Sequence, residues 1–291
     1  MSAIRPRRSV LYMPGSNARA IEKAKSLAAD TLILDLEDAV APDAKEMARR
    51  QVCDAVKQGG FGKRELVIRV NGLWTQWGED DLTAAMAAGP DAVLVPKVSS
   101  PDDLRAVEER FTGHDLERKT TIWAMMETPL AVLNAGAIAG AGGRLRCFVM
   151  GTNDLIKEFR GQHTPDRQNL SAALGISVAA ARAYGLAIVD GVYNDIQNAD
   201  GFVESCKQGR SYGFDGKTLI HPSQIGPCND VFAPSPAEVE AAKKIIAAFE
   251  QPENQGKGAI ALDGRMVELL HKEIAQQTVE MAEAIAALQD L

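Results

Sequence analysis

The 291-residue sequence predicts an α/β protein, a closed (β/α)₈ barrel with a C-terminal helical extension used in oligomer contacts. Eight short apolar runs alternate with Ala- and Glu/Lys-rich segments of helical spacing. The hydrophobic share of 46% with only 5% aromatic residues suits helices packed on buried parallel strands. A doubly wound sheet is the alternative, but it usually has fewer strands and a Gly-rich fingerprint that this sequence lacks.

The apolar runs have the length and flanking residues of buried strands. The first ends at Pro14-Gly15, and Ser16 or Asn17 is expected to cap the helix that follows. Helical spacing is clearest at 44–56, 102–110 and 170–184. The predicted strands are 9–13, 31–38, 66–72, 92–97, 123–127, 148–155, 186–191 and 216–222.

After His221-Pro222 the pattern changes. We expect a helix over about 237–250, an extended segment over 256–264 that ends in the Asp263-Gly264 turn, and a helix over about 265–288. The predicted division is therefore a catalytic barrel at 1–233 and an extension at 234–291. The extension exceeds what a barrel needs, so it is a candidate subunit contact that brings Asp263 to a neighbour's active site.

Charge and composition exclude several classes of protein. A net charge of −7 argues against a nucleic-acid surface, which needs a positive field. The four cysteines show neither a CxxC pair nor zinc spacing, as in a reduced protein. No signal peptide and no apolar run of about 18 residues is seen, so a cytoplasmic location without a membrane partner is the expectation.

Charged residues recur late in successive predicted strands, at intervals of 27 to 36 residues. In a (β/α)₈ barrel such residues gather at one mouth, which is where barrel enzymes have their active sites. The series is Asp35, Arg69, Lys97, Glu127, Asp154 and Asp190.

Glu127 and Asp154 are the candidate metal ligands. Two carboxylates with few other protein groups suit Mg²⁺, with Mn²⁺ as a possible substitute, because the ion keeps waters and leaves positions for substrate oxygens. The alternative is that both acids cap helices, since Thr128-Pro129 opens one. Asp35, Glu37 and Asp38 are too many acids for one cap, and we interpret them as groups that orient metal-bound water.

Arg69 lies inside an apolar run, where an unpaired charge is costly. One explanation is a structural ion pair with Asp35 or Glu37. The other is a guanidinium that faces a substrate carboxylate or an enolate oxygen. Because Arg69 belongs to the recurring series of charged residues, we favour the functional explanation. Lys97 is either a Schiff-base lysine or an ion-pair partner at the barrel mouth. His221 is a weak acid–base candidate and more often a structural residue.

Several ordered motifs run through the chain. They are Arg8-Ser-Val-Leu-Tyr-Met-Pro-Gly-Ser16, Leu34-Asp-Leu-Glu-Asp-Ala-Val-Ala-Pro42, Arg69-Val-Asn-Gly72, Val95-Pro-Lys97, Met126-Glu-Thr128, Met150-Gly-Thr-Asn-Asp154 and Gly216-Lys-Thr-Leu-Ile-His-Pro222. Together these motifs resemble the HpcH/HpaI aldolase family, in its branch of citrate lyase β-subunit-like proteins, malyl-CoA lyases and malyl-CoA thioesterases, and the resemblance covers nearly the whole chain. The stretches 123–128, 188–194 and 213–218 are most similar to the thioesterase members.

The resemblance implies residue roles as well as a barrel. Glu127 and Asp154 would hold Mg²⁺, Arg69 would bind substrate and steady a thioester enolate, and Asp263 would be an acid–base group from the adjacent subunit of a trimer or hexamer. The malyl-CoA lyases carry an arginine where this sequence has Asn17, and Arg19 is a possible substitute. The expected CoA contacts are Tyr12, Arg19, Lys23, Asn153, Ile220, His221 and Pro222.

The expected function is a Mg²⁺-dependent retro-Claisen cleavage of a β-hydroxyacyl-CoA of malyl-CoA or citramalyl-CoA type. The products would be an acyl-CoA and a 2-oxo acid such as glyoxylate or pyruvate. Hydrolysis of (3S)-malyl-CoA to malate and CoA on the same scaffold is the first alternative. A non-catalytic or carrier-dependent citrate lyase β-like subunit is the second.

Overall fold

The computed structural model describes residues 4–111 and 119–289 of the chain and shows a closed barrel of eight parallel strands. β1 pairs with both β2 and β8, which closes the sheet and excludes the doubly wound alternative. The strands are β1 (Ser9–Pro14), β2 (Thr31–Asp35), β3 (Glu65–Arg69), β4 (Ala92–Val95), β5 (Thr121–Met126), β6 (Leu145–Met150), β7 (Ala187–Asp190) and β8 (Gly216–Leu219).

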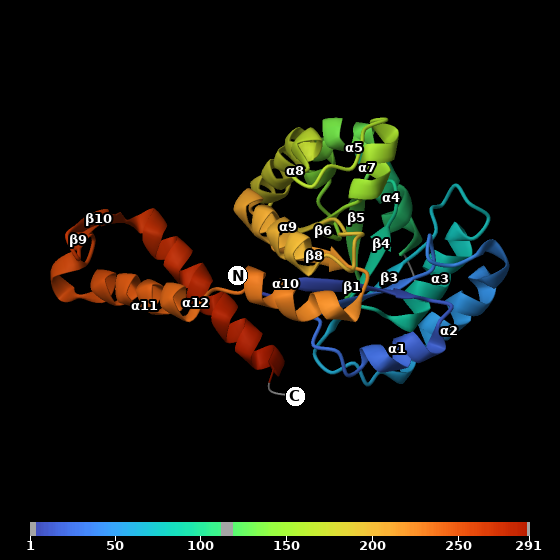
Figure 1. Ribbon diagram of the computed structural model, residues 1–291, viewed down its shortest axis with the longest axis horizontal. Coiled ribbons are helices and arrows are strands. Elements are labelled where there is room, and N and C mark those ends of the chain that lie inside the picture. The colour runs from blue at the N-terminus through green and yellow to red at the C-terminus, as the bar shows by residue number, and fades with distance from the viewer. Residues whose placement is uncertain (1–3, 112–118, 290–291) are drawn as a thin grey trace. The chain divides into compact units, whose positions relative to one another are not determined.

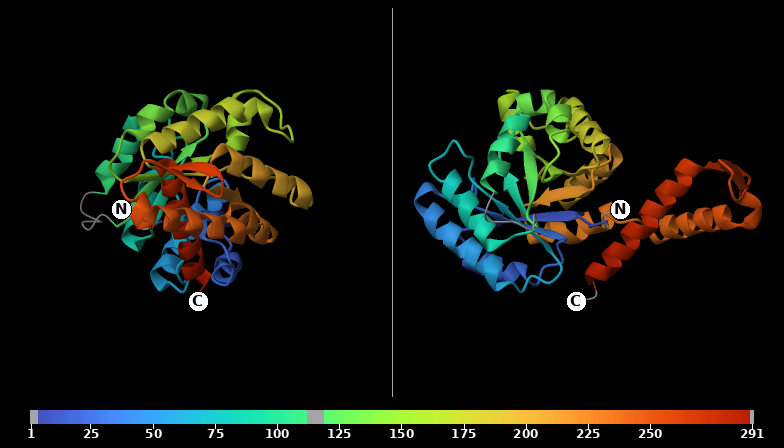
Figure 2. Two further views of the ribbon diagram at one scale, coloured as in Figure 1. Left: turned by 90° about the vertical axis from the view of Figure 1, so that its left-hand side faces the viewer. Right: turned by 180° about the vertical axis from the view of Figure 1, so that it is seen from behind.

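Helices cover the outside of the barrel (Figures 1 and 2). Asn17 caps α1, because its side-chain oxygen accepts the Ala20 N–H, as expected. The helices of the barrel are α1 (Ala18–Ala24), α2 (Lys45–Gln58), α3 (Gly78–Ala88), α4 (Pro101–Arg110), α5 (Pro129–Leu133), α6 (Ala135–Ala139), α7 (Thr152–Glu158), α8 (Ser171–Ala183), α9 (Ala199–Tyr212) and α10 (Ile225–Phe232), with 3₁₀ turns η1 (Pro42–Ala44), η2 (Gln168–Leu170) and η3 (Pro222–Gln224).

Two apolar clusters fill the barrel unit. Alternate strand residues point inward, as a pleated strand requires, and the inner cluster includes Ile33, Val67, Leu94 and Trp123. The other strand residues pack outward against the helices. Because the strands are parallel, their carboxyl ends share one rim, and that rim carries the polar residues of the site.

Arg7–Phe232 form one compact unit, and the chain from Ala233 belongs to a second. The second unit contains α11 (Pro236–Glu250), η4 (Pro252–Asn254), the antiparallel hairpin of β9 (Ala259–Leu262) and β10 (Arg265–Glu268), and α12 (Leu269–Gln289). Its own small core is built on Phe249, Ile260 and Val267.

The predicted start of the last helix at residue 265 is wrong, because residues 265–268 form β10. Asp263 and Gly264 both have positive φ, 49° and 76°, as a two-residue Asp-Gly hairpin turn requires. The turn pairs Arg265 with Leu262, and this pairing holds the next residues in a strand. No helix in the described part of the chain is long and apolar enough to cross a membrane.

Candidate active site

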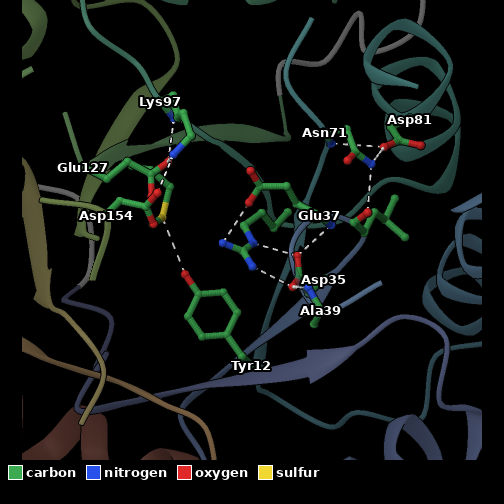
Figure 3. Close-up of polar contacts among 12 residues, drawn as sticks. Tyr12, Asp35, Glu37, Ala39, Asn71, Asp81, Lys97, Glu127 and Asp154 are labelled. Carbon is green, nitrogen blue, oxygen red and sulfur yellow. Dashed lines mark hydrogen bonds and ion pairs between the residues drawn. The ribbon is translucent and has the colours of Figure 1, made fainter. Parts of the chain in front are cut away.

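Glu127 and Asp154 follow β5 and β6, and Lys97 contacts both carboxylates (Figure 3). The backbone N–H of Lys97 donates to Glu127 Oε1 at 2.7 Å, and its Nζ donates to Asp154 Oδ1 at 2.6 Å. Nζ is also 3.9 Å from Glu127 Oε1. Lys97 has φ 49°, a left-handed conformation that is uncommon outside glycine and often found at functional sites.

Neither carboxylate caps a helix. Thr128 caps α5 through a side-chain oxygen that accepts the Ala131 N–H, and Gly151 holds the N-cap position of α7. Asp154 lies in the first turn of α7 with its carboxylate bonded to Lys97. The capping alternative therefore does not explain why these two acids are present.

Gly151 lets the two acids approach each other. A Cβ at this position would lie 2.4 Å from Glu127 Cβ and 2.6 Å from Glu127 Oε2, closer than real contacts allow. Glu127 therefore packs directly on the backbone that leads into α7 and Asp154. In the sequence, Gly151 is distinguished only as part of the Met150–Asp154 motif.

Glu127 is only 2% exposed, so its charge is poorly solvated. Burial raises the pKa of Glu127, the Lys97 ammonium lowers it, and the neighbouring Asp154 raises it again. Two facing carboxylates that already hold a cation fit a Mg²⁺ ion, which needs few protein ligands and keeps waters. Among the described residues no group of three or more His, Cys, Asp or Glu could hold a metal ion.

Arg69 occupies the next part of the rim, at the end of β3. Its Nε and Nη2 each donate to Asp35 at 2.6 Å, and its Nη1 lies 2.9 Å from Glu37 Oε2. Its guanidinium stacks 4.8 Å from the Tyr12 ring centroid. Burial alone would lower the pKa of Arg69, but Asp35 holds it above its usual value. The ion pair named in sequence analysis is thus present.

Asp35 is fully engaged, whereas Glu37 is not. Both Asp35 oxygens accept from Arg69, and they also accept the Glu37 and Ala39 backbone N–H groups. Glu37 Oε2 lies close to Arg69 but has no partner of hydrogen-bond geometry in the described structure. Burial raises the pKa of Glu37 to about 7, partly offset by Arg69. Asp38 is exposed to solvent.

Lys45, which was not predicted from the sequence, holds the chain next to this cluster by hydrogen bonds. Its buried Nζ donates to the Leu36 and Glu37 carbonyls and to Asn71 Oδ1, each within 2.9 Å. Burial lowers the pKa of Lys45. A lysine in the first turn of a predicted helix has the usual signature of a solvated residue, so no pattern in the sequence could have found it.

The expected CoA contacts lie in three places. Tyr12 is half-buried inside the barrel, against Arg69 and with its hydroxyl 3.5 Å from Met125 Sδ. Arg19 and Lys23 are exposed, one turn apart on α1. Asn153 exchanges amide hydrogen bonds with Asn194. The stretch Ile220, His221 and Pro222 follows β8.

His221 serves as a cap, which fits its structural interpretation. Its Nδ1 accepts the Ser223 N–H at the start of η3. Asp263 lies in the second unit, exposed at the tip of the β9–β10 hairpin.

The barrel rim thus brings the buried Glu127 and the partly buried Asp154 together with a paired arginine and an acid of raised pKa. The chain belongs to the HpcH/HpaI aldolase/citrate lyase family, whose model matches residues 8–222. A second model, C–C bond lyase of the TIM-barrel fold, matches residues 168–286. The resemblance expected from the sequence is thereby confirmed, as are the closed barrel and the helical extension that follows it.

Two curated relatives cover almost the whole chain. A (3S)-malyl-CoA thioesterase of Cereibacter sphaeroides is 51% identical over 282 residues, 97% of this chain and 96% of the relative. Citrate lyase subunit beta of Escherichia coli is 35% identical over 270 residues, 91% of this chain and 89% of the relative. The family and these relatives show an enzyme of the C–C lyase and malyl-CoA thioesterase family. The 51% identity to the thioesterase, against 35% to the citrate lyase subunit, favours the hydrolytic alternative over the lyase that was first expected.

Solved structures of similar fold carry bound ligands. CitE of Mycobacterium tuberculosis in complex with magnesium, acetoacetate and coenzyme A has a TM-score of 0.77 and 27% identity, covering 97% of this chain and 99% of that one. The citrate lyase beta subunit of the same organism, complexed with oxaloacetate and magnesium, has a TM-score of 0.68 and 28% identity over 79% of this chain and 98% of that one.

Proposed function

We propose that this enzyme hydrolyses (3S)-malyl-CoA to malate and CoA. The observation that carries the proposal is 51% identity, over 97% of the chain, to a (3S)-malyl-CoA thioesterase. The Glu127–Asp154 pair and the paired Arg69 support the same substrate, a hydroxy acid with a free carboxylate.

Glu127 and Asp154 would hold Mg²⁺, with Mn²⁺ as a substitute. When bound, the ion supplies Lewis-acid polarisation and positions for substrate oxygens. Lys97, which holds Asp154 and contacts Glu127, would have to release Asp154.

Arg69 and Glu37 would flank the thioester. The Arg69 guanidinium is fixed by Asp35 and Tyr12, so it presents a positive charge without reorganisation to the developing oxyanion. Glu37, with a pKa of about 7, suits a general base that takes a proton from the attacking water. Oxygen of water then bonds to the carbonyl carbon, the C–S bond breaks, and CoA leaves as a thiolate. Asp38, exposed beside Glu37, would orient water at the rim.

Asp263 would complete the site of an adjacent subunit in a homotrimer or hexamer and protonate the leaving thiolate. Its place at an exposed hairpin tip supports this role. A mixture of the inactive variants Asp263→Asn and Glu127→Gln tests it, because mixed oligomers would regain sites with both residues. Failure to regain activity after subunit exchange would contradict the sharing of Asp263 between subunits.

CoA would lie across the β1 and β8 ends of the rim. Arg19 and Lys23 would bind its phosphates, and Tyr12, Asn153 and the 220–222 stretch would contact the rest. Replacing both Arg19 and Lys23 by Gln should raise KM with little change in kcat. An unchanged KM would show that the CoA phosphates do not bind at Arg19 and Lys23.

The decisive assay supplies malyl-CoA and measures free thiol, malate and glyoxylate separately. Hydrolysis predicts equal thiol and malate with no glyoxylate. Glu127→Gln should abolish turnover, while Glu46→Gln, at an exposed acid of α2, serves as the control.

Retro-Claisen cleavage is the second candidate, supported by the match to the C–C bond lyase model. It predicts glyoxylate, or pyruvate from citramalyl-CoA, in equal amounts with an acyl-CoA. A non-catalytic or carrier-dependent citrate lyase β-like subunit is the third candidate, and the E. coli citrate lyase subunit is the relative that supports it. This candidate predicts no turnover of either free CoA thioester.

A further inference from the structure

Lys45, the first residue of α2, lies where a lysine is unfavourable for two reasons. It is only 6% exposed, so its ammonium loses most of its hydration. The N-terminus of a helix also carries a partial positive charge, which repels a cation in the first turn. The stability of α2 therefore gives no reason for a lysine at this position, and the contacts of its side chain have to offset both costs.

The side chain of Lys45 is held by three oxygen acceptors. Its Nζ donates to the Leu36 carbonyl and the Glu37 carbonyl at 2.9 Å each, and to Asn71 Oδ1 at 2.8 Å. Three acceptors suit the ammonium, which has three N–H donors, and not the neutral amine, which has two. Asn71 Nδ2 donates to the same Leu36 carbonyl at 2.8 Å. Lys45 thus fixes two successive carbonyls of the loop that follows β2.

The N–H groups of this loop are fixed by a second group, the carboxylate of Asp35 (Figure 3). It accepts the Glu37 N–H at 2.9 Å and the Ala39 N–H at 3.1 Å, and it also holds the Arg69 guanidinium. The backbone of Glu37 is therefore bonded at both its N–H and its carbonyl. Its Oε2 lies 2.9 Å from Arg69 Nη1 in this arrangement.

The charge of Lys45 also acts on the acids around it. Burial lowers the pKa of Lys45, whereas the carboxylates of Asp35, Glu37, Asp81 and Asp38 raise it. Because such an interaction is mutual, the ammonium favours the ionised form of Glu37. The other titratable groups that act on Glu37 are Arg69, Asp38, Glu127, Asp35, Lys97 and Tyr12.

We propose that Lys45 is a positioning residue for Glu37, which it holds through the backbone so that the Glu37 carboxylate lies beside Arg69 where water attacks the thioester. Its part in catalysis rests on the proposed function, in which Glu37 is the general base. The coupling between Lys45 and Glu37 does not rest on that function, and it can be measured without substrate. A purely structural lysine would stabilise the loop and leave the proton affinity of Glu37 unchanged.

The first test needs no turnover. Carboxyl ¹³C NMR of the metal-free, glutamate-labelled protein gives the pKa of Glu37, with Glu37→Gln assigning its signal. Lys45→Gln keeps two N–H donors but removes the charge, so the pKa of Glu37 should rise above its value of about 7. Lys45→Met, which keeps an apolar stem of similar length, is a second variant with the same expected direction. An unchanged pKa of Glu37 in these variants would overturn the proposal.

Arg64→Gln is the matched control. Arg64 also ties down backbone carbonyls, because its Nε donates to the Leu27 carbonyl and its Nη1 to the Phe61 carbonyl. It directly precedes β3, at the amino end of the strand, whereas the active-site rim is at the carboxyl ends. The pKa of Glu37 should be the same in Arg64→Gln as in the wild type.

The second test measures thiol release from malyl-CoA with Mg²⁺ present. Lys45→Gln should lower kcat about 10- to 100-fold with little change in KM, because a displaced base slows proton transfer and leaves substrate binding intact. The acidic limb of its kcat–pH profile should move to higher pH, while Arg64→Gln keeps the wild-type profile. A wild-type kcat or a wild-type pH profile in Lys45→Gln would overturn the positioning role. Absence of thiol release from the wild type would instead contradict the proposed hydrolysis, and the NMR titration would then decide whether Lys45 acts on Glu37.

Discussion

Two regions of the barrel rim hold acids from the same recurring series, yet their surroundings are opposite. Asp190, at the end of β7, is fully buried between Lys217 and Arg167. Glu127, after β5, is equally buried but shares one partly exposed lysine with Asp154. Burial would raise the pKa of Asp190, but its two cations lower it overall, whereas the pKa of Glu127 is raised.

The difference separates an acid that stabilises the fold from one available to a ligand. An acid that faces two cations is already neutralised, so a metal ion gains little there. Two acids that share one cation keep an excess of negative charge, which a divalent ion removes. The number of cations that each carboxylate contacts, more than its burial, therefore distinguishes the two regions.

The strongest test of this comparison replaces each acid by its amide. Asp190→Asn leaves the fully buried Lys217 without a carboxylate and should lower the free energy of unfolding by about 3–5 kcal/mol. Glu127→Gln removes a repulsion with Asp154 and should change stability by less than about 1 kcal/mol, while abolishing Mg²⁺ binding. Urea unfolding and metal calorimetry on both variants measure the two effects. Equal loss of stability would show that both regions are structural.

A pH series extends the comparison to Glu37. The pKa of Glu37 is about 7 in the folded protein against an ordinary value of 4.5, so the folded state keeps a proton that the unfolded chain releases. The contribution of protonated Glu37 to the free energy of unfolding is fully present below pH 4.5 and is lost as the pH rises towards 7. The loss is at most about 3 kcal/mol.

Metal-free wild type and Glu37→Gln should therefore converge in stability at low pH and diverge between pH 4.5 and 7, with the wild type falling. Denaturant unfolding at each pH in EDTA gives the curves, with Glu46→Gln as the exposed-acid control. Parallel curves for wild type and Glu37→Gln would show that folding leaves the pKa of Glu37 unchanged.

The packing of Glu127 on Gly151 predicts a selective loss of metal affinity. Gly151→Ala places a methyl group within 2.6 Å of Glu127 Oε2 and should weaken Mg²⁺ binding about 100-fold, by the displacement of a ligand. Gly175→Ala, a helical glycine of α8 with open space around it, is the control and should leave affinity unchanged. Electron paramagnetic resonance of bound Mn²⁺ measures the metal affinity of both variants directly. Unchanged binding in Gly151→Ala would mean that Glu127 is not a ligand.

Much of the fold could be predicted from the sequence because its signals are periodic. Eight buried runs and the recurring charges predicted the barrel and placed Arg69, Lys97, Glu127 and Asp154 on one rim. The second strand of the hairpin, which begins at Arg265, was missed because strand pairing across the Asp263-Gly264 turn overrides helical spacing.

The candidate site was predicted less completely, because partners far apart in sequence decide it. The donors that occupy Asp35 come from Arg69 and from its own loop, and Lys45 reaches Asn71 from another element. Asp190 carried the same spacing signal as Glu127, and only the positions of Lys217 and Arg167 separate the two. Such pairings depend on three-dimensional distances that no linear pattern records.

The smallest expected effect concerns Lys97, the cation that the Glu127 pair already holds. Its Nζ lies 2.6 Å from Asp154 Oδ1 and its N–H fixes Glu127, and the paired acids raise its pKa although burial lowers it. Lys97→Met keeps the backbone donor but removes the competing charge, so Mg²⁺ should bind about tenfold more tightly without substrate. Calorimetry at two salt concentrations measures this, with Lys157→Met on α7 as the charge control. Weaker binding in Lys97→Met would mean that the ammonium orients the ligands instead of competing with the ion, and the two regions would then differ less than their geometry indicates.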